Sequence, residues 1–176
     1  VLPNCLGDTS MFFDDTNPNS EPLTMWHWDF GDSSNPNDTS IIQNPAYLYP
    51  TYGIYKTELK VMNQYSCRDS ITESIEIYKP PEAGFSYEEN CMSYNTYFID
   101  ESVGDSSAIV RYFWNFGDTL TLKDISSKQY PKYIYNKTGN YTVELIIDDG
   151  NQCSDTITHD IAIYPLPTSA FVILDT

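Results

Sequence analysis

The chain has 176 residues and a formal net charge of −16, with 9 Lys plus Arg against 25 Asp plus Glu. So acidic a chain excludes nucleic acid as a partner, because phosphate backbones require a basic surface, and it disfavours anionic membranes. Hydrophobic residues at 40% and aromatic residues at 15% exclude a disordered acidic tail. No apolar run reaches the roughly 18 residues of a membrane-spanning helix.

Landmark residues recur along the chain with a constant offset of 86 residues. The pairs related by this offset are Cys5 and Cys91, Trp28 and Trp114, Tyr55 and Tyr141, and Cys67 and Cys153. An offset repeated without insertions is the pattern of a tandem repeat.

The repeat divides the chain. We expect a first repeat over 1–80, with its first strand truncated, and a second over 81–166, because the Pro-Pro pair near residue 80 ends a strand and stiffens the joint. The offset takes Phe85 to Phe171, so residues 167–176 are interpreted as the start of a third repeat. No counterpart of Ala83-Gly-Phe85 precedes the first repeat, which favours a segment of a longer array.

Apolar residues alternate with period two, and no stripe of period 3.6 is present, so the elements are predicted to be strands. In chain order they are expected near 26–30, 55–61 and 71–77, and again near 112–116, 141–147 and 157–163. The polar stretches 31–45 and 117–131 are expected to be long loops. The pattern predicts an all-β protein built of small antiparallel sandwiches.

Within these strands, Trp28 and Trp114 are interpreted as core residues of a central strand, and Trp26 is expected nearer a sheet end. Tyr55 and Tyr141 each follow Gly-x, at the start of a strand. A tyrosine at this place packs its ring inward and bonds its hydroxyl to nearby backbone, which is a structural role.

The motifs Trp28-Asp-Phe-Gly-Asp32, Pro45-Ala-Tyr-Leu-Tyr49 and Gly53-Ile-Tyr55 together resemble the PKD (polycystic kidney disease) domain family, and the second copy repeats them in the same order. The resemblance implies two tandem immunoglobulin-like β-sandwiches with an extracellular binding or spacing role and no catalysis. The Cys pairs resemble PKD repeats in secreted and surface proteins of Bacteroidetes-type bacteria. Asn115 departs from the usual Asp, and Ser33 and Thr119 replace a frequent Gly.

Four cysteines allow three pairings, and the repetition favours one bridge within each repeat, Cys5 with Cys67 and Cys91 with Cys153. No Cys-x-x-Cys spacing indicates zinc. Disulfides predict an oxidising, extracellular or cell-surface location.

Calcium is the one cofactor that the sequence suggests, because a hard cation takes carboxylate and carbonyl oxygens and some PKD-like domains bind it. The alternative is that these residues serve turns and the surface, since no D-x-D-x-D-G loop is present. The candidate ligands are Asp14, Asp15, Asp29, Asp32, Asp100, Glu101, Asn115 and Asp118.

Ser70, Thr119 and Thr156 follow Asp and precede an apolar residue, which resembles the O-glycosylation acceptor of Bacteroidetes. His27 and His159 stand at non-equivalent places, and no nucleophile or nucleotide-binding motif is present, so the chain is predicted not to be an enzyme.

The expected function is a non-catalytic spacer and adhesion module in a large, adhesin-like cell-surface or secreted protein. The expected partners are neighbouring repeats of the same chain and surface polysaccharide or protein, with neither nucleic acid nor direct membrane insertion. The alternatives are a spacer or carbohydrate-binding module of a secreted hydrolase, and a subunit of an extracellular filament.

Overall fold

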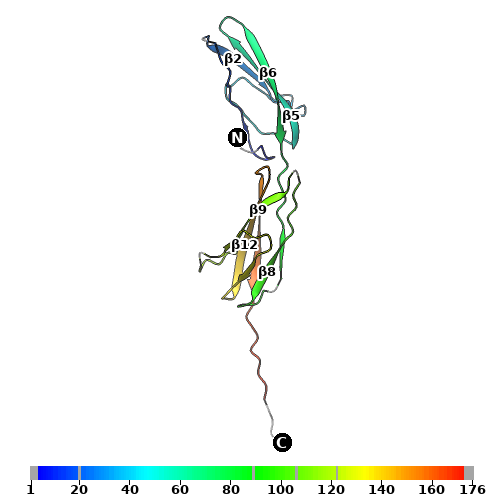
Figure 1. Cartoon of the computed structure of the whole chain (residues 1–176), viewed down its shortest axis with the longest axis vertical. Coiled ribbons are helices and arrows are strands. Elements are labelled where there is room, and N and C mark those ends of the chain that lie inside the picture. The colour runs from blue at the N-terminus through cyan, green and yellow to red at the C-terminus, as the bar shows by residue number, and fades with distance from the viewer. Residues whose placement is uncertain (1–3, 20, 89, 106, 122, 173–176) are drawn as a thin grey trace. The chain divides into compact units, whose positions relative to one another are not determined.

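The computed structural model describes residues 4–19, 21–88, 90–105, 107–121 and 123–172. These residues form two compact units, Val1–Pro80 and Pro81–Thr176 in chain numbering, and every regular element in them is a strand (Figure 1). No helix long and apolar enough to cross a membrane is found among them. The all-β prediction is confirmed, with antiparallel sheets in both units.

The first unit contains β1 (Ser10–Met11), β2 (Leu23–Asp29), β3 (Thr39–Ser40), β4 (Ala46–Tyr47), β5 (Gly53–Asn63) and β6 (Arg68–Ile77). Four of them form a sheet in the order β3-β2-β5-β6, and β1 pairs with β4. The long hairpin β5–β6 runs in register from Gly53 opposite Ile77 to Met62 opposite Arg68.

The second unit contains β7 (Phe85–Glu88), β8 (Asn95–Asp100), β9 (Ile109–Asn115), β10 (Ile125–Ser126), β11 (Lys132–Ile134), β12 (Gly139–Asp149) and β13 (Ser154–Ile163). The sheets are β10-β9-β12-β13 and β11-β8-β7. The hairpin β12–β13 begins with Gly139 opposite Ile163, the same register at an offset of 86 residues. The stretches expected to be loops each contain one short strand, β3 and β10.

Alternation places one face of β5 and of β12 in the core, as expected, whereas β6 is exposed along most of its length. Thr57, Leu59 and Val61 of β5 are buried, whereas Lys56 and Lys60 on the opposite face are exposed and Glu58 is half-buried. Trp114 is fully buried in the second unit and Trp28 is buried in the first, whereas Trp26 is half-buried. The expected inward face of these strands is therefore confirmed.

The glycine of each Phe-Gly-Asp motif allows two strands to pass closely. Gly31 and Gly117 have φ of 73° and 71°. A Cβ on Gly31 would lie 2.4 Å from the carbonyl oxygen of Lys56, and one on Gly117 would lie 2.3 Å from that of Thr142. Both the backbone conformation and the close carbonyl therefore require glycine.

Candidate functional site

The first unit has a groove of about 720 Å³ between its two sheets, formed by β1, β2, β5 and β6. We call this feature the open groove. The apolar side chains that line it are Met11, Phe12, Phe13, Trp28, Leu59, Val61, Ile71 and Ile75. Asp69 and Thr16 lie at its rim, and Ile71 is 56% exposed. An apolar hollow edged by polar groups is the usual form of a binding site in a sandwich of this size.

An aromatic column runs through each unit next to the core. In the first unit the rings of Phe30 and Tyr47 stack with centroids 4.4 Å apart, and Tyr49 lies 4.9 Å from Tyr47 and 4.2 Å from Tyr55. The second unit repeats the column with Phe116, Tyr133, Tyr135 and Tyr141. Aromatic pairs at these separations add to the energy of burial. Tyr49 and Tyr135 are core residues, and the other tyrosines of the family motif pack against the core.

The aspartate of each Phe-Gly-Asp motif is buried and binds a tyrosine of this column. The hydroxyl of Tyr47 donates to Asp32 at 2.8 Å, and that of Tyr133 donates to Asp118 at 3.0 Å. Ser34 also donates to Asp32, and its hydrogen bonds hold the pKa of that carboxyl below the ordinary value. Asp32 therefore attaches the loop after β2 to the aromatic column of the first unit, and Asp118 attaches the loop after β9 to that of the second unit.

The predicted tyrosine corners are present. The hydroxyl of Tyr55 donates to the carbonyl oxygen of Thr51 at 2.9 Å, and that of Tyr141 donates to the carbonyl oxygen of Lys137 at 3.0 Å. Their rings pack against the buried clusters of the two units. Both tyrosines have the structural role that the sequence predicts.

Three further candidate calcium ligands, Asp29, Glu101 and Asn115, accept hydrogen bonds from the protein itself. Asp29 and Asn115 accept the N–H groups of Gly31 and Gly117 at 2.9 and 3.0 Å. Glu101 accepts the hydroxyl of Ser86. These bonds close turns or join neighbouring strands.

Asp14 and Asp100 hold the ends of two short strands. Asp14 accepts the indole N–H of Trp26 at 2.7 Å and the amide of Gln43 at 3.1 Å, and Asp100 accepts the amide of Gln129 at 2.9 Å. Within the described ranges, no group of three or more His, Cys, Asp or Glu side chains converges as a metal site would require. Calcium binding at these residues and at Asp15 stays a hypothesis, and the hydrogen bonds favour the alternative that these side chains serve turns and the surface.

The cysteines correct the sequence interpretation. Cys67 and Cys91 are exposed free thiols, whereas Cys5 and Cys153 are buried and disulfide-bonded. The predicted bridges Cys5–Cys67 and Cys91–Cys153 are therefore wrong, although the presence of a disulfide is confirmed.

Strand length explains this correction. The backbone of Cys5 forms an isolated β-bridge with that of Tyr78, which follows the end of β6. Cys67 lies directly before the start of β6. Ten strand residues separate positions by about 33 Å, whereas a disulfide needs Cα atoms within about 7 Å. The same distance separates the second predicted pair. The backbone of Cys91 forms a β-bridge with that of Tyr164, which follows β13, whereas Cys153 precedes β13.

The predicted glycosylation residues lie on the surface. Ser70 on β6, Thr156 on β13 and Thr119 in the turn after β9 are all exposed. Accessibility is a requirement for modification and no more, so glycosylation stays a prediction.

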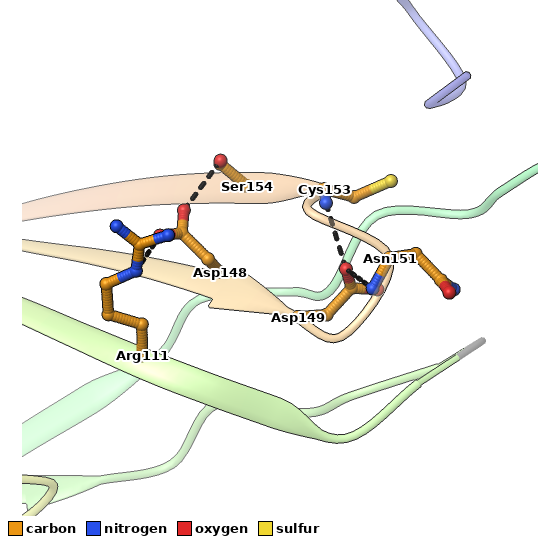
Figure 2. A network of polar contacts seen from close by, with 6 residues as sticks. All are labelled: Arg111, Asp148, Asp149, Asn151, Cys153 and Ser154. Atoms are coloured by element: carbon orange, nitrogen blue, oxygen red, sulfur yellow. Dashed lines mark hydrogen bonds and ion pairs between the residues drawn. The ribbon is translucent and has the colours of Figure 1, made fainter. Parts of the chain in front are cut away.

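A buried carboxylate that the sequence analysis missed stabilises the turn between β12 and β13 (Figure 2). Asp149 is 2% exposed, and its Oδ1 accepts the N–H groups of Asn151 and Cys153, both at 2.9 Å. The preceding residue of β12, Asp148, forms an ion pair with Arg111 of β9, with 2.9 Å between Oδ2 and Nε. Asp148 also accepts a hydrogen bond from the hydroxyl of Ser154 on β13. In the first unit the equivalent of Asp149 is Asn63, whose side chain accepts the N–H groups of Tyr65 and Cys67 in the turn before β6. The repeat offset, which places two turn-forming side chains at equivalent positions, was the sequence signal for this turn.

The fold and these sites define a tandem array of antiparallel sandwich modules whose aromatic and acidic motif residues maintain structure. The chain belongs to the PKD domain family, which matches residues 5–78 and 80–163. Domains of this family are generally non-catalytic accessory modules and occur in extracellular or secreted proteins.

Three similarities accompany the family match. A region of 50 residues is 36% identical to part of the collagenase ColA of Bacillus cereus, covering 28% of this chain and 5% of that protein. The PKD1 domain of Vibrio anguillarum Epp is 24% identical with a TM-score of 0.45, covering 49% of this chain and 96% of the domain. The PKD1 domain of the Vibrio cholerae metalloprotease PrtV is 27% identical with a TM-score of 0.43, covering 48% and 96%.

Proposed function

We propose that the chain is an extension segment of an extracellular, adhesin-like protein that separates and presents other parts of that protein. The observation that carries the proposal is the path of the chain through the second unit. Ala83 donates its N–H to Asp155 at the start of β13, and the chain leaves after Tyr164 at the far end of the same strand. We call these the incoming and the outgoing end of the unit.

Because β13 has ten residues, the two ends are about 33 Å apart. Tension applied between the incoming and the outgoing end of the unit pulls β7 and β13 lengthwise, against the ladders that join them to β8 and β12. Hydrogen bonds loaded in this way break together, whereas a hairpin opened from one end loses them one at a time. A module of this design is suited to bear tension along an array.

The wider proposal places the segment on the cell surface, in contact with neighbouring repeats and with polysaccharide or protein. The alternative role as a spacer of a secreted hydrolase is supported by the similarity to part of a collagenase. Binding of the intact chain to glycan and protein arrays tests adhesion. The same arrays probed with the Tyr97→Ala variant test whether Tyr97, a 44% exposed aromatic residue of β8, contributes to that binding.

Single-molecule pulling on the whole chain tests the extension proposal. With the disulfide reduced, pulling through the termini should unfold the second unit at higher force than pulling through handles at Asn140 and Tyr164. These two exposed residues lie at the same end of the β12–β13 hairpin, so the second geometry unzips it. Equal or lower force through the termini would contradict a tension-bearing role.

A further inference from the structure

Each of the two cysteine positions of the repeat occurs once as a free thiol and once in a disulfide. The first position is bonded in Cys5 and free in Cys91, and the second is free in Cys67 and bonded in Cys153. Cys5 and Cys153 are 5% and 0% exposed, whereas their equivalents are exposed. The position within the repeat therefore does not decide whether a cysteine is bonded.

The backbone holds the first position in the same way in both units. Leu6, next to Cys5, donates its N–H to the carbonyl oxygen of Tyr78 at 2.8 Å, and Tyr78 donates to that of Asn4 at 2.8 Å. The same two bonds, both at 2.9 Å, join the equivalent residues of the second unit, Asn90, Met92 and Tyr164. Because Tyr78 and Tyr164 follow the last strands, this position belongs to the outgoing end of its unit.

The second position is also held alike in both units. The side chain of Asn63 accepts the N–H of Cys67 at 3.0 Å, and that of Asp149 accepts the N–H of Cys153 at 2.9 Å (Figure 2). Each of these cysteines directly precedes the last strand of its unit. The start of that strand marks the incoming end, so the second position belongs to the incoming end.

The strand between the two positions of one unit excludes a disulfide between them. β6 and β13 each have ten residues and span about 33 Å, whereas a disulfide requires Cα atoms within about 7 Å. The partner of a bonded cysteine therefore lies outside its own unit. Since Cys67 and Cys91 are free thiols, Cys5 and Cys153 remain to form a disulfide in this chain.

The chain path from the outgoing end of the first unit to the incoming end of the second is short. Five residues lead from Tyr78, beside Cys5, to Ala83, and they span at most about 18 Å. Ala83 then donates its N–H to Asp155 at 2.7 Å, two residues after Cys153. We call the residues between Tyr78 and Ala83 the joint, and one cysteine of each type is attached on either side of it.

We propose that a disulfide across the joint links successive repeats, with the cysteine at the outgoing end of one repeat bonded to the cysteine at the incoming end of the next. In this chain the pair is Cys5 with Cys153. By the same rule, Cys91 takes the bridge to a copy of the repeat joined after the second unit, and Cys67 takes that to a copy joined before the first. This inference goes beyond the proposed function and does not depend on it.

The bridge forms by thiol–disulfide exchange with a small disulfide such as oxidised glutathione. One cysteine thiolate attacks a sulfur of the reagent, forms a mixed disulfide and releases one small thiolate. The second cysteine thiolate attacks the cysteine sulfur of the mixed disulfide and releases the other. Two electrons pass from the cysteine pair to the reagent, and the two protons leave with the two small thiols.

Counting free thiols tests the pairing, with a maleimide present as the unreduced chain is denatured. We expect two thiols in the parent chain. Cys5→Ser should raise the count to three because it releases Cys153, whereas Cys67→Ser, the matched control, should lower it to one. Peptide mapping without reduction should find Cys5 linked to Cys153. A parent without free thiols, or a count that rises in Cys67→Ser, would overturn the proposal.

Lengthening the chain by one repeat tests the rule at a second joint. Residues 81–166 are repeated once after Leu166 of the full chain, which keeps the spacing of 86 residues. The lengthened chain should have two bridges and again two free thiols, because Cys91 now bonds to the added copy of Cys153. Replacing that added cysteine by Ser should give three free thiols. Four free thiols in the lengthened chain would overturn the rule.

Extension under force gives an independent readout on the parent chain. With the disulfide intact, tension applied at the termini bypasses the residues between Cys5 and Cys153. Reduction should therefore release about 500 Å of additional contour length when both units unfold. A gain of only about 200 Å would place the bridge between the two positions of one unit, and it would overturn the proposal.

Discussion

The hydroxyl of Tyr135 donates to the carbonyl oxygen of Phe116 at 2.9 Å, and both side chains are fully or almost fully buried. Tyr49 makes the equivalent bond to Phe30 at 3.2 Å in the first unit. There, Thr57 donates to the same carbonyl at 3.3 Å, whereas its equivalent Val143 has no hydroxyl. The carbonyl of Phe30 in the first unit therefore has two side-chain donors, Tyr49 and Thr57, whereas the carbonyl of Phe116 in the second unit has Tyr135 and no equivalent of the threonine.

Tyr135→Phe should reduce the free energy of unfolding of the second unit by about 1–3 kcal/mol, because the buried carbonyl of Phe116 loses its donor. Tyr49→Phe should cost the first unit less, because Thr57 still donates to Phe30. Urea titration of the full chain, followed by tryptophan fluorescence, measures both. Adding Thr57→Val to Tyr49→Phe should raise the cost to that of Tyr135→Phe, and equal costs for the two single variants would contradict this account.

Alkaline pH should destabilise the fold. Burial raises the pKa of Tyr49 to about 12, and burial followed by the Asp100 carboxylate raises the pKa of Tyr112 to about 12. In the unfolded chain a tyrosine ionises near pH 10, so above that pH the unfolded state binds fewer protons than the folded state. Stability should therefore be fully present below about pH 10 and fall as the pH rises toward 12.

Urea midpoints at a series of pH values, with tyrosinate absorbance recorded alongside, test this expectation. Ionisation of these tyrosines should coincide with unfolding. A chain that shows full tyrosinate absorbance while still folded would be inconsistent with buried hydroxyls.

The cysteines should differ sharply in reactivity. Without reductant, an alkylating reagent should modify Cys67 and Cys91, which are exposed thiols, and leave Cys5 and Cys153 unmodified. Peptide mapping by mass spectrometry locates the label, and labelling after reduction and unfolding provides the control for all four. Protection of Cys67 or Cys91 in the unreduced chain would show a different pairing.

Calcium should have little effect on thermal stability. The oxygens of Asp14, Asp32 and Asp118 already accept hydrogen bonds from the protein, and a cation would have to replace them. We expect the melting temperature to be the same in millimolar calcium and in chelator. An increase with calcium would instead support the predicted ligand set, because a ligand that binds only the folded state raises its stability.

The sequence predicted β2, β5, β6, β9, β12 and β13 because burial imposes a period of two that is visible in residues such as Leu59 and Val61. It did not predict the shorter strands β1, β3, β4, β7, β10 and β11, which have two to four residues and are too short to show a period, nor β8, whose apolar residues stand on both faces. The tyrosine corner at Tyr55 was accessible from the Gly-x-Tyr motif. The bond of Tyr47 to Asp32 was not, because it depends on how a long loop folds back onto the core.

Constant spacing misled the disulfide prediction for a physical reason. Identical offsets show that two positions are equivalent in successive repeats, but they say nothing about which positions face each other. The strand between Cys67 and the site of Cys5 fixes their separation, and only its length and direction decide the question.

The placement of the incoming and outgoing ends on opposite sides of a unit has a genetic consequence. Gain or loss of one 86-residue copy changes the contour of the protein by a fixed increment and leaves the buried clusters intact, because each cluster is built from residues of its own unit. Recombination between in-register copies can therefore adjust the length of such a protein in whole steps, without selecting any new packing interaction.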